Sequence, residues 1–114
     1  MSDSKVVGER RMQARRSLKG AARVMLPTGQ VFEVRTTDIS VEGIGIVAAA
    51  NPRNGTTFTI QVTLPTRPTG ATTFEAKAKV VHSILAGEED GFKIGLTFSD
   101  ITPEIEAAIQ KYVG

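Results

Sequence analysis

The sequence predicts a single all-β domain, a small barrel or sandwich with a short C-terminal helix. One reason is the alternation of apolar and polar residues, the period of a half-buried strand, which is clearest over Thr57 to Leu64. A second is that turn signals separate such runs. A third is a change to helical spacing near the C-terminus. The length of 114 residues fits one domain with one core.

The strands follow in order. Two further alternating runs are Phe74 to Val80 and Phe92 to Phe98, and earlier strands are expected at about Gly20 to Leu26, Val31 to Ile39 and Gly43 to Val47. The first two are joined by the turn LPTGQ, in which proline fixes φ and glycine accepts a positive φ, so they form a hairpin. Because one face of each run is polar, an antiparallel sheet is expected.

The expected helix begins after Thr102, which can cap it with Pro103 at the first position. Its apolar stripe should pack against the sheet and comprises Ile101, Ile105, Ala108, Ile109 and Tyr112. The opposite end of the chain is different in kind. The segment Glu9 to Gly20 reads ERRMQARRSLKG, and we expect residues 1–19 to form a flexible basic arm before a folded body over residues 20–114.

The net charge of the basic N-terminal part also differs from that of the folded body. The net charge of the chain is +2, but residues 1–23 carry +5 and the remainder therefore −3. A basic arm on a mildly acidic body predicts an anionic partner that is met by the arm. With no cysteine and one histidine, thiolate chemistry is excluded and we expect a binding protein rather than an enzyme, without metal or cofactor. We also expect a cytoplasmic protein without membrane insertion, because no apolar run is long enough to span a bilayer.

Two short motifs carry binding chemistry. In the arm, Arg11 and Arg15 have the spacing RxxxR, flanked by Arg10 and Arg16; arginine matches phosphate oxygens and the edge of guanine, and it stacks on flat rings. The second motif is D-x-S-x-x-G at the junction of the second and third strands: Asp38, Ser40 and Gly43. An ionised aspartate accepts only, which suits the donors of a guanine edge. Each motif alone is weak.

Together, the arm ERR-x-x-x-R, the hairpin, D-x-S-x-x-G and the closing GLTF of Gly95 to Phe98 resemble the PilZ family over nearly the whole chain. The resemblance implies a six-stranded antiparallel β-barrel that binds cyclic di-GMP, a bacterial second messenger with two guanines and two phosphodiesters. It makes Arg11 and Arg15 the motif arginines and Asp38, Ser40 and Gly43 the rim. Arg10 takes the position that influences whether one ligand or a stacked pair is held.

Other residues have two interpretations. The alternation places His82 on the face of Phe74 and Val80 and favours the edge of the barrel core, whereas the resemblance allows a stacking platform at the rim. Gly95 serves close packing or ligand approach, and Arg16 is a further candidate contact. Two alternative functions remain: a PilZ-like protein-interaction module without ligand, and weak non-specific nucleic-acid binding through the arm. Specific nucleic-acid recognition is not expected, because aromatic residues for base stacking are scarce. The output should pass through an unidentified partner protein.

Overall fold

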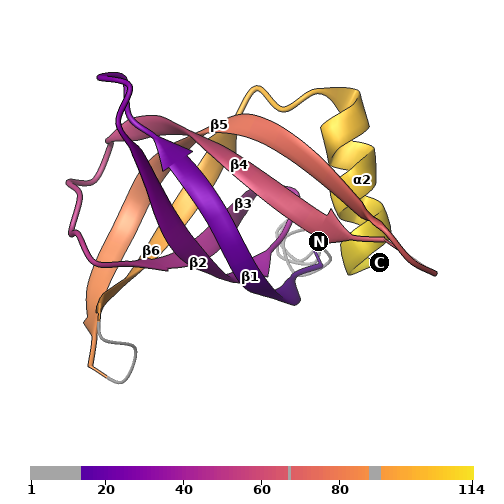
Figure 1. Ribbon diagram of the computed structural model, residues 1–114, viewed down its shortest axis with the longest axis horizontal. Coiled ribbons are helices and arrows are strands. Elements are labelled where there is room, and N and C mark those ends of the chain that lie inside the picture. Colours follow the sequence, from indigo (N-terminus) through magenta and orange to yellow (C-terminus); the bar gives the residue numbers. More distant parts are fainter. Residues whose placement is uncertain (1–13, 67, 88–90) are drawn as a thin grey trace, which may run out of the picture.

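The computed structural model describes residues 14–66, 68–87 and 91–114, which form six strands and a C-terminal helix. In chain order these are β1 (Arg16–Met25), β2 (Val31–Ile39), β3 (Gly43–Ala48), β4 (Thr57–Pro65), β5 (Ala71–Ala86), β6 (Gly91–Ser99) and α2 (Pro103–Val113). All neighbouring strands are antiparallel, and the sheet closes in the order β1-β2-β3-β6-β5-β4 (Figure 1). The predicted all-β class and six-stranded barrel are confirmed.

The first strand begins earlier than the sequence indicated. Pairing with β2 starts at Arg16, opposite Ile39, and continues at Ser17, opposite Asp38, so residues 16–19 belong to a strand rather than to the arm. The register then shifts between Ser17 and Gly20. The buried hydroxyl of Thr36 donates to the Leu18 carbonyl at 2.6 Å. The polar character of this segment concealed a strand because only one of its side chains, Leu18, is buried.

The barrel interior is built from the alternating runs. On β4 and on β5 as far as Val80, every second residue is buried, as the period predicted, namely Phe58, Ile60, Val62, Leu64, Phe74, Ala76, Ala78 and Val80. The rings of Phe74 and Phe98 meet edge to face, with centroids 6.1 Å apart. Burying a large apolar side chain contributes about 1.5–3 kcal/mol. This interior is therefore the main source of stability.

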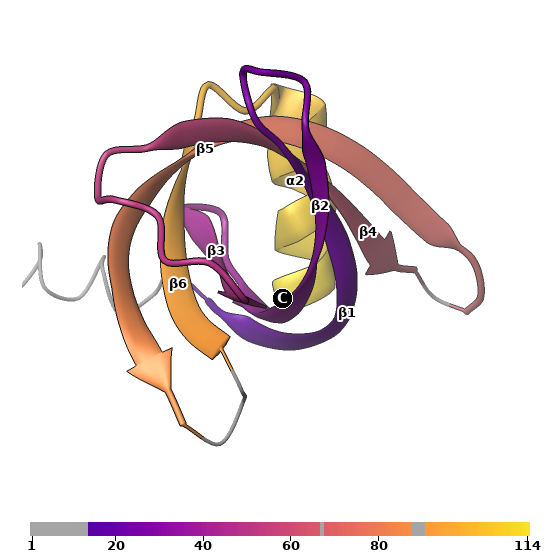
Figure 2. The same ribbon diagram turned by 60° about the vertical axis from the view of Figure 1, so that its left-hand side comes forward.

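Helix α2 lies across one end of the barrel (Figure 2). The Thr102 hydroxyl accepts from the Ile105 N–H at 3.2 Å and caps the helix, with Pro103 in its first turn, as predicted. Ile109 is fully buried in the common core, and the rest of the expected stripe packs against it. Within the described residues, no helix has the length and apolar character that crossing a membrane requires.

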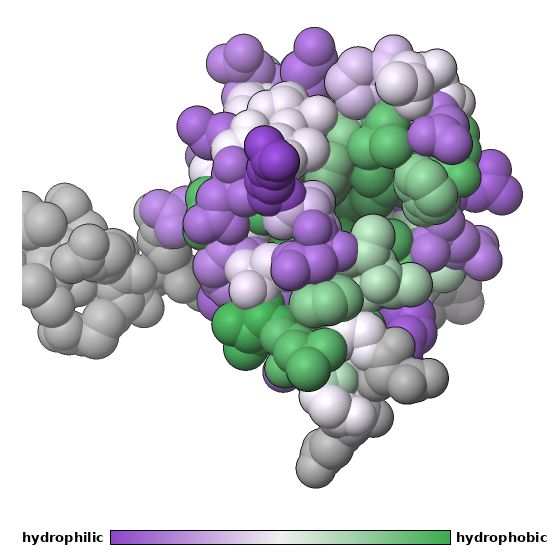
Figure 3. All heavy atoms as spheres, turned by 90° about the vertical axis from the view of Figure 1, so that its left-hand side faces the viewer, coloured by the Kyte–Doolittle hydropathy of each residue, from purple (hydrophilic) through white to green (hydrophobic). Residues whose placement is uncertain are grey.

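The side of the barrel away from α2 exposes apolar side chains among polar ones (Figure 3). The large exposed hydrophobic residues come from the β1–β2 hairpin and from the second half of β5: Met25, Val31, Phe32, Val81, Ile84 and Leu85. The β5 residues matter for the site, because two of them, Val81 and Ile84, border its pocket.

Candidate functional site

Two irregularities in strand pairing shape one outer wall of the barrel. Between β2 and β3, Thr36 pairs with Ile46 but Asp38 pairs with Gly45, so Thr37 is an extra residue. Thr36 is buried, whereas Thr37 and Asp38 are partly exposed. A bulge of this kind re-aims side chains and is frequent beside functional sites. It turns two successive polar side chains toward the outside of the wall.

A second bulge lies in β5, two strands beyond β3 in the sheet. Val80 pairs with Leu96 and His82 with Gly95, which leaves Val81 as the extra residue. Val80 is buried, but Val81 and His82 are both exposed. The expectation that His82 lies at the edge of the core was therefore wrong, because the bulge resets the alternation on which it depended.

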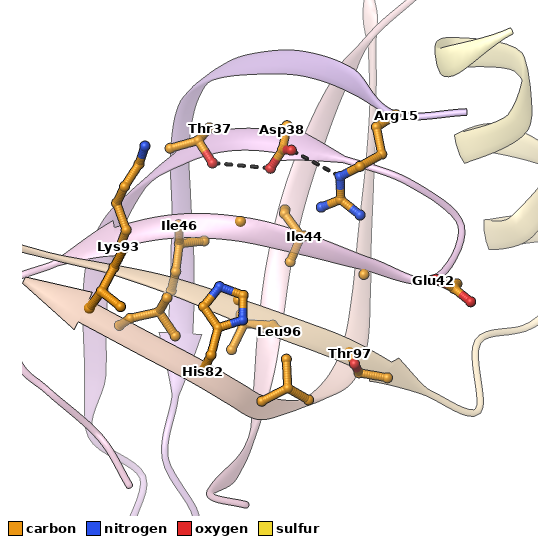
Figure 4. A pocket seen from close by; sticks show the side chains of 16 residues that line it. Arg15, Thr37, Asp38, Glu42, Ile44, Ile46, His82, Lys93, Leu96 and Thr97 are labelled. Atoms are coloured by element: carbon orange, nitrogen blue, oxygen red, sulfur yellow. Dashed lines mark hydrogen bonds and ion pairs between the residues drawn. The ribbon is translucent and has the colours of Figure 1, made fainter. Parts of the chain in front are cut away.

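The bulges align four residues in one row across four strands. Asp38 on β2 faces Gly45 on β3, Gly45 faces Gly95 on β6, and Gly95 faces His82 on β5. Paired residues project to the same side of a sheet, so a carboxylate and an imidazole flank two positions without side chains. Figure 4 shows both side chains over the same wall. Gly45 and Gly95 thus form a strip without side chains of its own, flanked by two polar side chains, which we call the glycine floor.

The glycines of this floor are required by their neighbours. A Cβ at position 45 would lie 2.5 Å from both the Asp38 Oδ1 and the Thr37 Oγ1 atoms, closer than real Cβ contacts allow. A Cβ at position 95 would overlap the imidazole ring of His82. Thr37 and Asp38 therefore lean over one glycine and His82 over the other. Gly95, which the sequence assigned to packing or to ligand approach, packs against a side chain of the site itself.

Arg15 joins the two sequence motifs. Its Nε donates to the Asp38 Oδ2 at 2.9 Å, and its Nη1 donates to the Ser40 Oγ at 3.0 Å (Figure 4 shows the first). The other carboxylate oxygen, Oδ1, accepts from the Thr37 hydroxyl at 3.1 Å. The hydrogen bond from Arg15 lowers the pKa of Asp38 below its ordinary 3.8, against the opposing effect of burial. Asp38 is thus an ionised acceptor at neutral pH.

Ser40 and Gly43 form the turn beneath this pair. The Ser40 N–H donates to the Gly43 carbonyl at 2.9 Å, while the Ser40 Oγ accepts from the Glu42 and Gly43 N–H groups at 3.2 and 3.3 Å. Ser40 is 1% exposed. A Cβ at Gly43 would overlap the carbonyl oxygen of Leu96 on β6, so glycine is required here for close strand packing. Ser40 and Gly43 hold the shape of the rim on which Arg15 rests.

The floor and its walls line a pocket of about 480 Å³. It includes Arg15, Asp38, Gly43, His82 and Gly95 from the sequence-based set. Lining residues that the sequence analysis did not select as site residues include Thr37, Glu42, Gly45, Val81, Ile84, Lys93 and Thr97. The outward positions of Lys93 and Thr97 follow from alternation on β6. What they face depends on strand order and on the bulges, which no local pattern indicates.

The remaining candidates lie elsewhere. Arg16 turns away from the pocket: its guanidinium lies 4.5 Å from the Tyr112 ring centroid, and its Nη1 donates to the Tyr112 carbonyl at 2.8 Å. Arg10 and Arg11 fall outside the described residues. No group of three or more potential metal ligands occurs in the parts of the chain described above. The site is an open, polar-walled slot suited to a flat ligand with hydrogen-bond donors and negative charge.

Solved structures share this architecture. The fold superposes on the Bacillus subtilis inhibitor of motility (MotI/DgrA) with a TM-score of 0.79 at 18% identity, covering 90% of this chain and 48% of that one. It superposes on the PilZ domain of Escherichia coli YcgR with c-di-GMP with a TM-score of 0.67 at 19% identity, covering 91% of this chain and 88% of that one. For the Borreliella burgdorferi PlzA protein in complex with c-di-GMP, the TM-score is 0.67 at 14% identity, and the match covers 98% of this chain and 44% of that one.

This chain therefore spans about half the length of the MotI and PlzA chains and most of the YcgR domain. At these identities the likeness establishes the fold. No curated protein sequence matches the chain. The family assignment comes from sequence instead: the family model for the PilZ domain matches residues 9–114, which includes both motifs and the whole barrel. The chain belongs to the PilZ domain family.

Proposed function

We propose that this protein is a receptor for cyclic di-GMP. The observation that carries the proposal is the bridge from Arg15, the last arginine of RxxxR, to Asp38 and Ser40 of D-x-S-x-x-G, at the end of a glycine floor. Support also comes from the family and from the YcgR and PlzA structures, which are complexes with this nucleotide.

The chemistry of the slot suits a guanine nucleotide. Ionised Asp38 accepts from the guanine N1 and N2 donors, because its lowered pKa keeps it charged and acceptor-only. The fork of Arg15 reaches a phosphate oxygen or the guanine O6/N7 edge. Gly45 and Gly95 add no side chains between Asp38 and His82, and the exposed His82 ring, which lies over Gly95, offers a flat face to a base. A good bidentate base contact is worth about 1–3 kcal/mol in discrimination.

The arm completes the site in this proposal. Arg11 contacts the phosphates as the first motif arginine, and Arg10 sets whether one ligand or a stacked pair is held. Closure of the arm neutralises its cations against the ligand. This changes the surface that an output protein meets.

Contacts at the start of β1 give such a signal a route to α2. Arg16, directly after Arg15, stacks on the Tyr112 ring and donates to the Tyr112 carbonyl. The Tyr112 hydroxyl in turn donates to the Ser17 carbonyl at 2.7 Å. We call these three contacts the β1–α2 clasp. One peptide bond separates the residue of the pocket from the residue of the clasp, so movement of Arg15 toward a ligand strains the clasp.

The test is calorimetric titration with cyclic di-GMP, beside GMP and GTP. Asp38→Ala removes the guanine acceptor, and Arg11→Ala and Arg15→Ala each remove a phosphate contact; we expect loss of at least about tenfold for each, the effect of one charge-assisted hydrogen bond. Matched controls are Glu75→Ala and Arg23→Ala, exposed residues of the same types outside the pocket. They should bind like wild type.

Each negative result has a defined meaning. No binding by a folded wild-type protein would reject the receptor function and favour a protein-interaction module. Binding that tolerates Asp38→Ala but weakens steeply with salt would instead indicate non-specific attraction of nucleic acid to the arm.

A further inference from the structure

We infer that Lys93 is a second anchor for phosphate, at the end of the pocket away from Arg15. The inference rests on the proposed function and assigns the contacts of a ligand that carries two phosphodiesters. It concerns a residue that neither motif contains.

The position of Lys93 follows from the register of β6. Lys93, Gly95 and Thr97 project outward, whereas Ile94 and Leu96 between them are buried in the barrel. Lys93 pairs with Val47 on β3 and with Ile84 on β5, one outward position along the strand from the glycine floor. Figure 4 shows its side chain beside Thr37, on the side of Thr37 opposite to Arg15. The two cations therefore stand at opposite ends of the slot.

The distance between these ends suits a dinucleotide. Lys93 lies two strands across and two residues along from Asp38, and strand spacings of about 4.8 Å with a rise of about 3.4 Å per residue give a Cα separation of about 12 Å. A ligand held by Asp38 and Arg15 at one end must extend over Gly45 and Gly95 to reach Lys93. The glycines carry no side chains of their own, but Thr37 and Asp38 lean over Gly45 and the His82 ring lies over Gly95, so the ligand crosses this stretch in contact with those side chains.

The two cationic side chains of the pocket, Arg15 and Lys93, differ in whether they are already paired within the protein. Arg15 already donates to Asp38 and Ser40, so much of its charge is compensated within the protein. Lys93 is exposed, and in the described ranges its ammonium group has no hydrogen bond or ion pair. Arg35, on the other side of Val47, borders two different hollows. Among the described residues that line the pocket, Lys93 is thus the lysine or arginine without a hydrogen bond or ion pair, and it can contact an anionic group of the ligand.

The surroundings of Lys93 strengthen its attraction for phosphate. Ile84 and Val81 form an apolar border on the β5 side of the pocket. A bound nucleotide resting against them removes water from the ammonium group, and charge interactions strengthen as water is excluded.

The test is titration of cyclic di-GMP into wild type, Lys93→Gln, Lys93→Arg and the control Lys77→Gln. Lys77 is an exposed lysine on β5 that lies outside the pocket. Each titration is run at about 0.1 M and about 1 M salt, where the Debye length is about 10 Å and about 3 Å. We expect Lys93→Gln to bind about tenfold more weakly at the lower salt. Lys93→Arg keeps the charge and should stay within about threefold.

The salt dependence distinguishes charge from structure. Loss of a charge contact makes the deficit of Lys93→Gln shrink at high salt, whereas a structural defect would leave it unchanged. Equal affinities of Lys93→Gln and Lys77→Gln, or a deficit independent of salt, would overturn the inference while the receptor function stands. Failure of the wild-type protein to bind would overturn both.

Discussion

The barrel has two kinds of wall. Strands β4 and β5 pair from Thr57 opposite Lys79 to Pro65 opposite Ala71 without a shift in register. On the site side, the β2–β3 and β5–β6 pairings each contain a bulge. Regular pairing sends every second side chain into the core, while a bulge sends two successive side chains to one side. Both walls therefore contribute buried side chains to the core, and the second also presents the candidate binding surface.

The sharpest separation of these roles should come from Ile60, which is fully buried in the regular wall. Ile60→Ala should reduce the free energy of unfolding by about 2–5 kcal/mol, through lost burial and a cavity. Ligand affinity, measured where the variant is folded, should not change. Urea unfolding and calorimetry check both expectations, with Gln61→Ala, on the outer side of the same strand, expected to destabilise by less than about 1 kcal/mol. A parallel fall in affinity would show that the walls are not independent.

The reverse experiment fills the floor of the site. Gly95→Val places a branched side chain where the His82 ring lies, and that ring is exposed and can move aside. We expect at least about a 100-fold loss of cyclic di-GMP affinity, about 2.7 kcal/mol. The free energy of unfolding should stay within about 1 kcal/mol of wild type, because valine suits a strand. Gly87→Val, in open space, is the control. Retained affinity would mean that the ligand does not use this floor.

A smaller effect should link the site to the helix. Tyr112→Phe removes the hydroxyl that donates to Ser17 and leaves the ring under Arg16. The expected loss of stability is about 0.5–1.5 kcal/mol, the net value of one hydrogen bond. Ligand affinity should shift as well, since the β1–α2 clasp adjoins Arg15. Gln110→Ala, exposed on the same helix turn, provides the comparison in urea unfolding and calorimetry. Unchanged ligand affinity in Tyr112→Phe would show that the β1–α2 clasp does not influence ligand binding at the site.

The smallest effect concerns pH. Because the pKa of Asp38 is lower in the folded protein than its ordinary 3.8, its ionised form stabilises the fold. That contribution is fully present above about pH 4 and is lost as the pH falls through the lowered folded value. With both side chains of the Arg15–Asp38 pair partly exposed, it should be below about 1 kcal/mol. Wild type should lose this advantage over Asp38→Asn in urea unfolding between neutral and acidic pH. If the difference in unfolding free energy between wild type and Asp38→Asn did not change with pH, the lowered pKa of Asp38 would be contradicted.

Local pattern was sufficient where the chain is regular. The alternation at Phe58 to Leu64 and the cap at Thr102 depend on neighbours in sequence, so they predicted the buried faces and the helix start correctly. The start of β1 did not follow from pattern. Its polar residues pair with β2, and the carbonyl of Leu18 is satisfied by Thr36, a contact between distant positions.

The residues of the site likewise fall into those that local motifs predicted and those that depend on strand pairing. The motifs indicated Arg15, Asp38 and Ser40, which the fold brings within hydrogen-bonding distance. His82 was misplaced and Lys93 was not selected, because a bulge and a non-consecutive neighbour decide what each faces. Bulges leave little trace in composition, since the extra residues Thr37 and Val81 are ordinary strand residues. A sequence shows which residues can bind, but the register decides which of them meet.

The glycine floor has one more consequence. It lies on the outside of the barrel wall, so a nucleotide bound as proposed would rest on it with one face. In the proposed complex, the upper face of the nucleotide remains part of the outer surface, beside the exposed apolar residues Val81 and Ile84 that border the pocket. Under the proposed function, an output protein would then contact the bound nucleotide itself, so the ligand would form part of the interface between the two proteins.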